Sequence, residues 1–210
     1  MLPPTIPIFP LPNVVLFPNV FLPLHIFEPR YREMVADALN GDRIVGMVLL
    51  RPGWEGEYEG RPAVYPIGCA GVITRAERLQ DGRYNIMLQG MEKFRITTED
   101  GHRLYRVAYV DSIVESPKEA DRDAMRTARR RLEALLVPQP TGRGMEQKVP
   151  PSMPDEDLVN ALAQYLELEP VEKQALLERD SLLERCLSLI DLLEMKVIVA
   201  QHNWGGEGTH

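Results

Sequence analysis

Side chains able to act as nucleophiles or metal ligands are few and scattered along this chain. The two cysteines, Cys69 and Cys186, lie far apart and form no Cys-x-x-Cys pair, so nothing supports a zinc site built on cysteine. Cys69 lies in a glycine-flanked, strand-like stretch, and Cys186 lies on the apolar face of a helical pattern. Buried thiols of this kind are usually inert apolar residues. We therefore expect neither cysteine to be catalytic.

The histidines and serines also lack catalytic spacing. No His-x-His or His-Glu-x-x-His pattern occurs, and His25, set among apolar residues, is interpreted as a core residue with satisfied ring nitrogens. No serine lies in a Gly-x-Ser-x-Gly turn. The sequence also contains no Gly-Lys dipeptide and no Gly-x-Gly-x-x-Gly that opens a helix after a strand, so phosphate-cradling loops are not predicted. We expect no catalytic residue, no metal and no cofactor.

Arginines gather on one predicted helix, at positions 122, 126, 129, 130 and 131. Acidic partners lie three residues away, in the pairs Glu119–Arg122, Asp123–Arg126 and Arg130–Glu133. The whole chain has 24 Lys+Arg against 31 Asp+Glu, a net charge of −7. A solvated, partly paired helix face is therefore favoured over a nucleic-acid site, which needs a basic excess.

Two aromatic residues, Trp54 and Tyr58, lie in a glycine-rich loop over residues 51–62, interleaved with glutamates. Large aromatic side chains are highly buried on average, so both could pack back onto the domain. Alternatively they are partner-contact anchors, because Trp and Tyr often carry interface energy.

The elements that must position these residues form two halves. The first thirty residues hold eight of the 18 prolines, which predicts short, partly edge strands rather than long central ones. Apolar spacing then predicts a helix from Pro29 to Asn40. Short strands are expected over residues 6–9, 14–17, 20–24, 44–50, 64–74, 84–88, 94–96 and 104–114.

From Ser116 onward the apolar spacing is helical. Ser116 can cap a helix that Pro117 begins, a proline-rich linker covers residues 137–154, and helices are expected over 155–168, from Pro170, and from Asp180 or Ser181. We expect a β-rich subdomain over residues 1–115, a helical subdomain over 116–203 and a flexible tail over 204–210. Ordinary globular composition, the few cysteines and the lack of a signal peptide or apolar run of membrane-spanning length predict a cytoplasmic protein.

Three stretches resemble a known family. Residues 6–39 (IPIFPLPNVVLFPNVFLPLHIFEPRYREMVADAL) are similar to the opening of the N-terminal, substrate-recognition domain of Lon proteases, and HIFEPRYR at 25–32 is closest to stand-alone Lon-domain proteins. Residues 172–193 resemble the helical end of that domain more weakly. Residues 65–96 are similar to its glycine-marked strands through Gly68, Gly71, Asp81, Gly82, Gly90 and Phe94.

The resemblance implies an α+β fold, with a PUA-like, β-rich pseudo-barrel subdomain followed by a C-terminal helical bundle. It also implies binding of proteins or of unfolded, extended peptide segments. Full Lon proteases continue into an ATPase module and a Ser–Lys peptidase module, neither of which is found in these 210 residues. We therefore expect a non-catalytic module whose partners include peptide segments and a Lon-like or other ATPase machine.

Glu28, Arg30 and Tyr31 match the family motif and join Trp54 and Tyr58 as candidate partner-binding residues. Each of the three also has a structural interpretation. The charge of Glu28 suits a helix start, Arg30 can pair with Glu28 or with Glu33, and Tyr31 belongs to the buried helix face.

Three functions compete. A peptide-binding module leads, and short edge strands would allow strand addition. RNA binding is the alternative, because PUA-like folds elsewhere bind RNA, although the charge of −7 opposes it. A cryptic hydrolase comes third, because no nucleophile, base and orienting group can be assigned. Contact with a membrane is not expected.

Overall fold

The computed structural model describes residues 2–57, 60–116, 118–136 and 153–204. The chain divides into two compact units. Unit 1 comprises Met1–Val114 and Asn160–Glu178, and unit 2 comprises Glu115–Val159 and Arg179–His210. The division expected between residues 115 and 116 was based on the change from strand patterns to helix patterns. The compact units are defined by packing, which places Asn160–Glu178 with the strands.

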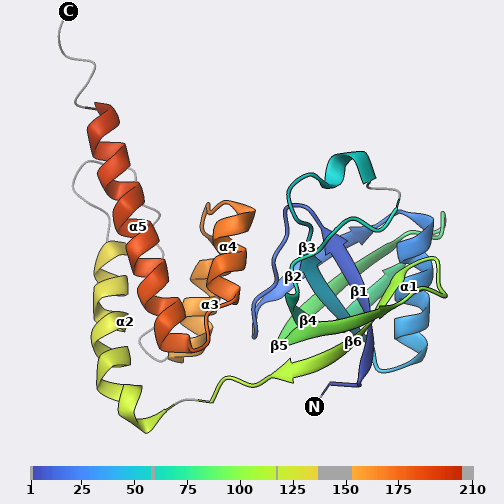
Figure 1. Ribbon diagram of the computed structural model, residues 1–210, viewed down its shortest axis with the longest axis horizontal. Helices are drawn as coiled ribbons and strands as arrows, with labels where there is room; N and C mark the ends of the chain where they lie inside the picture. The colour runs from blue at the N-terminus through green and yellow to red at the C-terminus, as the bar shows by residue number, and fades with distance from the viewer. Residues whose placement is uncertain (1, 58–59, 117, 137–152, 205–210) are drawn as a thin grey trace, which may run out of the picture. The chain divides into compact units, whose positions relative to one another are not determined.

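Unit 1 is built on one mixed sheet (Figure 1). Its strands are β1 (Thr5–Leu11), β2 (Phe21–Ile26), β3 (Ile44–Leu49), β4 (Ile67–Arg78), β5 (Tyr84–Asp100) and β6 (Arg106–Ile113). The order is β2-β5-β4-β3-β1-β6, and β5 also pairs with β6. Only β1 and β3 are parallel among these pairings. Because β5 pairs with both β4 and β6, five of the strands form a closed ring, and β2 extends it from β5.

Glycines permit close approaches within this sheet. A Cβ on Gly68 would lie 2.3 Å from the carbonyl oxygen of Met47, and one on Gly90 would lie 2.0 Å from that of Phe17. The register of β4 against β5 shifts between Ala70 and Gly71, an irregularity of the kind that glycine permits in a strand. Gly90 therefore lets the segment before β2 cross β5, whereas sequence analysis read the same region as a gap between two strands.

Helix α1 (Pro29–Asn40) lies as its apolar spacing predicted. Proline at its first position supplies a suitable φ and needs no hydrogen-bond acceptor there. Tyr31, Met34, Val35 and Ala38 are buried. The rings of Tyr31 and Phe9 on β1 are 4.4 Å apart between centroids, tilted by 49°. This contact fixes the start of α1 against the sheet.

The last residues of α3 (Asp155–Tyr165) and the whole of α4 (Pro170–Leu177) belong to unit 1. Their buried amides bond to backbone groups of the strand-rich part. Gln164 Oε1 accepts from the Phe17 amide (3.2 Å), Asn160 Nδ2 donates to Pro18 O (3.1 Å), and Gln174 Nε2 donates to Ile67 O (2.9 Å). These bonds satisfy backbone groups that lie outside the ladder.

Unit 2 contains the short helix η2 (Glu119–Asp121), α2 (Arg122–Leu136), the start of α3, and α5 (Leu182–Trp204). Helices α2 and α5 are joined by a two-pronged bond from Arg131 to Glu194 (2.6 and 2.8 Å). Arg185 on α5 is wholly buried and pairs with Glu115. A buried guanidinium needs such a partner, because desolvation of a lone charge is costly.

Several sequence expectations were wrong. Residues 14–17 form no strand, although residues 15–17 are buried, and residues 84–96 lie in one strand, β5, rather than two. The helix expected from Pro117 begins at Arg122, after η2, and Pro117 itself lies outside the described residues. On α5, the apolar spacing predicts that Leu187 and Val197 face inward, but they are 41% and 44% exposed. The linker over 137–154 falls almost wholly outside the described residues.

The charged and aromatic residues also departed from expectation in two places. His25 is exposed rather than in the core, with Nδ1 2.7 Å from Asn85 Oδ1. Arg129 pairs with Glu133 (2.8 Å), whereas Arg130 was expected to. The expected pairs Arg122–Glu119 (2.7 Å) and Arg126–Asp123 (3.6 Å) are confirmed. Among the described helices, none has the length and apolar character needed to cross a bilayer.

Candidate functional site

A hollow of about 610 Å³ in unit 1 brings together three of the predicted binding residues. Glu28, Arg30 and Tyr31 lie on one wall, at the start of α1. The second wall is the 60–62 loop and the third is the segment that joins β5 to β6. The full lining is Pro10, Glu28, Pro29, Arg30, Tyr31, Leu50, Gly60, Arg61, Pro62, Gly101, Arg103, Leu104, Tyr105 and Arg106. We call it the unit 1 hollow.

The α1 wall is held together by its own charges. Glu28 occupies the N-cap position of α1 but makes no side-chain cap bond. Its carboxylate instead pairs with Arg30, 3.0 Å from Nη2 and 3.1 Å from Nε. Of the two partners expected for Arg30, this pair is therefore the one with Glu28. The Arg30 guanidinium lies 4.7 Å from the centroid of the Tyr31 ring, where cation–π attraction holds it. The structural interpretation of these three residues is thus confirmed, beside their place in the hollow.

The opposite wall contains a second charged cluster. Arg103 Nη1 pairs with Asp37 and donates to the Tyr105 hydroxyl (2.5 Å). The Tyr105 hydroxyl donates to Asp37 Oδ2 (2.6 Å). Burial, together with the hydrogen bond to Asp37 and its charge, raises the pKa of Tyr105 to about 12. The phenol is therefore a fixed hydrogen-bond donor at neutral pH, not a proton-transfer group.

The two remaining arginines of the hollow differ in their partners. Arg106 is nearly buried and forms a two-pronged bond to Glu99 through Nε (2.8 Å) and Nη2 (2.5 Å), with Nη1 donating to Pro62 O. Arg61 is exposed, and its Nη1 donates to the backbone oxygen of Asp100 (3.1 Å). Arg106 thus fixes the 60–62 loop, whereas the exposed Arg61 has a backbone oxygen and no carboxylate as its partner among the described residues.

The other two predicted residues are not among those lining the hollow. Trp54 lies in the short helix η1 (Trp54–Glu57) and is half-buried, and Tyr58 lies outside the described residues. Sequence reasoning missed Arg61, Arg103, Tyr105 and Arg106. The sequence showed only that two short segments contain arginine, GRP at 60–62 and RLYR at 103–106. These segments are far apart in sequence, and the bonds from Arg61 to Asp100 O and from Arg106 to Pro62 O bring them together.

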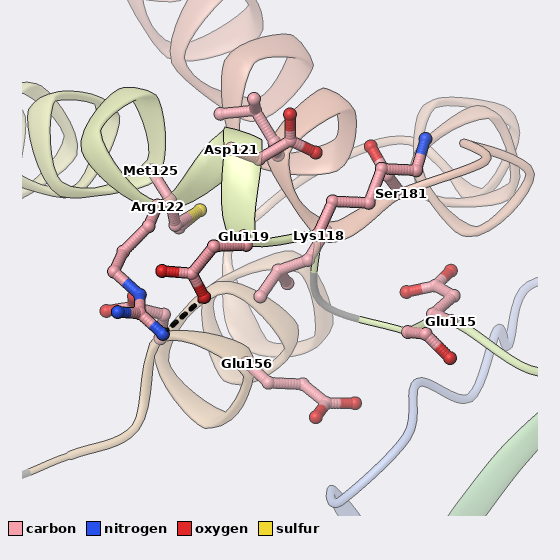
Figure 2. A pocket seen from close by; sticks show the side chains of 12 residues that line it. Glu115, Lys118, Glu119, Asp121, Arg122, Met125, Glu156 and Ser181 are labelled. Atoms are coloured by element: carbon pink, nitrogen blue, oxygen red, sulfur yellow. Dashed lines mark ion pairs between the residues drawn. The ribbon is translucent and has the colours of Figure 1, made fainter.

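A second pocket, of about 380 Å³, lies within unit 2 (Figure 2). Its acids come from three segments: Glu115, the η2 residues Glu119 and Asp121, and Asp155 and Glu156 at the start of α3. Desolvation, and then the neighbouring charge of Glu115, raises the pKa of Glu156. Figure 2 shows Arg122 paired with Glu119, so part of this acidity is already neutralised.

The chemistry available to the described residues follows from their surroundings. Burial raises the pKa of the Cys186 thiol to about 11, so that thiol is a poor nucleophile at neutral pH. Within the described ranges, no three His, Cys, Asp or Glu side chains converge to hold a metal ion. The unit 1 hollow presents guanidinium donors, one carboxylate and an apolar floor, groups that form hydrogen bonds, ion pairs and apolar contacts.

The chain matches a described family over most of its length. The match is to the "ATP-dependent protease La (LON) substrate-binding domain" and covers residues 5–195. The Lon protease of Flavobacterium johnsoniae is 26% identical over 211 residues, covering 93% of this chain and 24% of that protein. Lon protease 2 of Myxococcus xanthus is 27% identical over 202 residues, with coverage of 93% and 24%. The chain thus spans about a quarter of the length of these curated relatives.

Two solved structures share the fold. The Lon N-terminal domain protein from Xanthomonas campestris superposes with a TM-score of 0.61 at 22% identity, covering 89% of this chain and 97% of that chain. The N-terminal domain of Mycobacterium avium complex Lon protease gives 0.64 at 16% identity, with coverage of 90% and 98%. At these identities the likeness concerns the fold alone: a six-stranded sheet with helices toward the C-terminus.

Proposed function

The chain belongs to the Lon substrate-binding domain family, and from that premise we propose that it is a non-catalytic module that binds unfolded or extended polypeptide segments. The observation that carries the proposal is the match to a substrate-binding domain over residues 5–195. The unit 1 hollow supports it, because its wall contains Glu28, Arg30 and Tyr31 at the family-like motif. Side chains on rigid elements around an apolar floor are suited to recognition.

The proposed binding surface includes Glu28, Arg30, Tyr31, Trp54 and Tyr58. Glu28 and Arg30 offer a paired acid and base at the start of α1, where an amide of a peptide could bond to either. Trp54, half-buried in η1, and Tyr58 are proposed as aromatic anchors in the loop that leads to the 60–62 wall. A Lon-like or other ATPase machine is the proposed partner to which bound segments are delivered.

We also infer that the closed strand ring is a PUA-like pseudo-barrel and that the protein works in the cytoplasm. The first inference is supported by the ring through β5, β4, β3, β1 and β6. The second is supported by two free, buried cysteines, Cys69 and Cys186, which fit a reducing compartment.

RNA binding remains the second candidate because of the same ring. The four arginines of the unit 1 hollow are the observation that favours it. Against it, three of them pair with carboxylates, Arg30 with Glu28, Arg103 with Asp37 and Arg106 with Glu99. A phosphate backbone is bound by several cations whose charge is available.

The proposal is tested by titrating a fluorescent, permanently unfolded polypeptide, reduced and blocked at its cysteines with a neutral group. We expect saturable binding, with the polypeptide still full length after prolonged incubation. The double variant Trp54→Ala, Tyr58→Ala should bind at least tenfold more weakly, since aromatic anchors commonly contribute about 2 kcal/mol. Tyr109→Ala, an exposed aromatic on β6, is the matched control.

Three outcomes count against parts of the proposal. Failure of the wild-type protein to bind the unfolded chain would overturn the proposed function. Cleavage of the bound chain would overturn the non-catalytic assignment. Undiminished binding by the double variant would remove Trp54 and Tyr58 from the surface and leave the α1 wall.

A further inference from the structure

We infer that the unit 1 hollow selects extended segments that carry an acidic side chain next to an apolar one, with Arg61 as the ion-pair partner of the acid. This inference rests on the proposed function and specifies the class of peptide that the hollow takes. The charge of the hollow differs from that of the whole chain. The chain has a net charge of −7, whereas four arginines and one carboxylate line the hollow.

The charges of the hollow do not all cancel. Arg30, Arg103 and Arg106 each pair with a carboxylate of unit 1. Arg61 bonds to a neutral backbone oxygen, that of Asp100, and no carboxylate in the described part of the chain pairs with it. The carboxylate of Asp100 is turned to the amide of His102 (3.1 Å). Among the described residues, Arg61 is thus the guanidinium of the hollow whose charge no carboxylate balances, and a guanidinium binds a carboxylate through two parallel hydrogen bonds.

Apolar surface lies beside this charge. Leu104 lines the hollow with 77% of its surface exposed, so its side chain is available to an apolar side chain of a ligand. Pro10 and Leu50 lie deeper and are buried. An apolar residue of the bound segment would cover Leu104 while its acidic neighbour meets Arg61.

The same lining limits the ligand to one acid. The other three guanidiniums of the hollow already pair with carboxylates of unit 1, so a second acid of the ligand would meet no further unbalanced guanidinium among the described residues. A phosphodiester chain is disfavoured for the same reason, because it carries a negative charge at every nucleotide. A chain terminus is disfavoured because captured terminal carboxylates are typically held by clusters of backbone N–H groups, whereas the donor here is a side-chain guanidinium.

The test compares three short peptides, acetylated and amidated at their ends, identical except for Asp, Asn or Lys at a central position flanked by leucines. Binding is measured by fluorescence anisotropy at low and at physiological salt. We expect the Asp peptide to bind about tenfold more tightly than the Asn peptide and more tightly still than the Lys peptide. Arg61→Gln should remove this preference, and Arg61→Lys should restore part of it.

The control is Arg75→Gln, which removes the same charge from an exposed site on β4 outside the unit 1 hollow. Arg61 is exposed and bonds one backbone oxygen, so its substitution should not unfold the protein, which circular dichroism checks. Equal binding of the three peptides, or an unchanged preference in Arg61→Gln, would overturn this inference while leaving the proposed function standing. Binding of none of them, with no binding of an unfolded chain, would overturn the function itself. Tight binding of single-stranded RNA that depends on Arg61 would also overturn the inference.

Discussion

Tyr105 illustrates how single side chains around the unit 1 hollow are tied to their neighbours. Its ring is buried in the segment that joins β5 to β6, which forms the third wall. Its hydroxyl joins Asp37 on α1 to Arg103. One phenol thus links two walls of the hollow. Since the charge of a phenolate would be desolvated and placed against Asp37, the folded protein holds the proton tightly.

This predicts a loss of stability at high pH that Tyr105→Phe would not show. The pKa of Tyr105 is about 12 in the folded protein, against about 10 in an unfolded chain. Below the unfolded value both states are neutral and the stabilisation is complete. Between the two values the unfolded chain ionises first, so the free energy of unfolding falls by about 2 kcal/mol as pH rises.

Urea unfolding at about pH 8 and at about pH 11.5 measures this effect. Wild type should exceed Tyr105→Phe by about 1 kcal/mol at the lower pH, the value of one hydrogen bond, and should be about 1 kcal/mol less stable than the variant at the higher pH. Tyr109→Phe, exposed on β6, should follow the wild type at both. Parallel pH dependence in wild type and Tyr105→Phe would show that the phenol is not held as described.

At the residue scale, local spacing predicted what lies within one turn of a helix. The burial of Tyr31 was predicted from the start of α1, and Glu28 was one of the two partners expected for Arg30. Arg61 and Arg103 could not be predicted to line one hollow, because the bonds that tie the 60–62 loop to this part of the chain are long-range: Arg106 donates to Pro62 O, and Arg61 donates to Asp100 O. The sequence therefore predicted the α1 wall of the candidate site. The 60–62 wall and the wall between β5 and β6 became apparent only from the tertiary structure.

At the scale of elements, a buried side-chain amide holds α4 against the strands of unit 1. Gln174 is 2% exposed, and its Nε2 donates to Ile67 O (2.9 Å) and to Glu178 Oε1 (2.9 Å). Gln174→Leu keeps the approximate volume but removes both bonds. We expect the free energy of unfolding to fall by about 1–3 kcal/mol, because a buried carbonyl loses a donor.

Urea denaturation of unit 1, followed by near-ultraviolet circular dichroism of its tyrosines, checks this prediction. Gln80→Leu, in the exposed turn after β4, is the matched control and should change stability by less than about 0.5 kcal/mol. If Gln174→Leu were as stable as the control, α4 would not be packed on the strand-rich part as described.

Local patterns predicted the elements well where each element forms its own bonds. The spacing of α1 and the apolar run of β3 were confirmed. Residues 14–17 were expected to form a strand; they form none, and the amide of Phe17 donates instead to Gln164, 147 positions later. The full length of β5 was missed because residues 84–88 and 94–96 were read as two strands, whereas Gly90 between them has no side chain and admits Phe17.

At the scale of the whole molecule, unit 1 combines a closed strand ring with a hollow whose three walls come from α1, the 60–62 loop and the β5–β6 connection. Ring closure gives the walls fixed positions, which suits recognition without large rearrangement. Unit 2 presents an acidic pocket, opposite in character to the arginine-lined hollow. The division of the chain into a β-rich part to residue 115 and a helical part from residue 116 stays a prediction about how the two parts fold.

The central claim, that the unit 1 hollow binds polypeptide, is tested most directly by site-specific photocrosslinking. A benzophenone amino acid replaces Leu104, which is 77% exposed in the hollow, or Val114, which is 72% exposed and outside it. Each protein is irradiated with a labelled unfolded polypeptide and a labelled single-stranded RNA present together. We predict an adduct with the polypeptide at position 104 and none at 114. An adduct with RNA at position 104, equal labelling at both positions, or no adduct at 104 would contradict the claim.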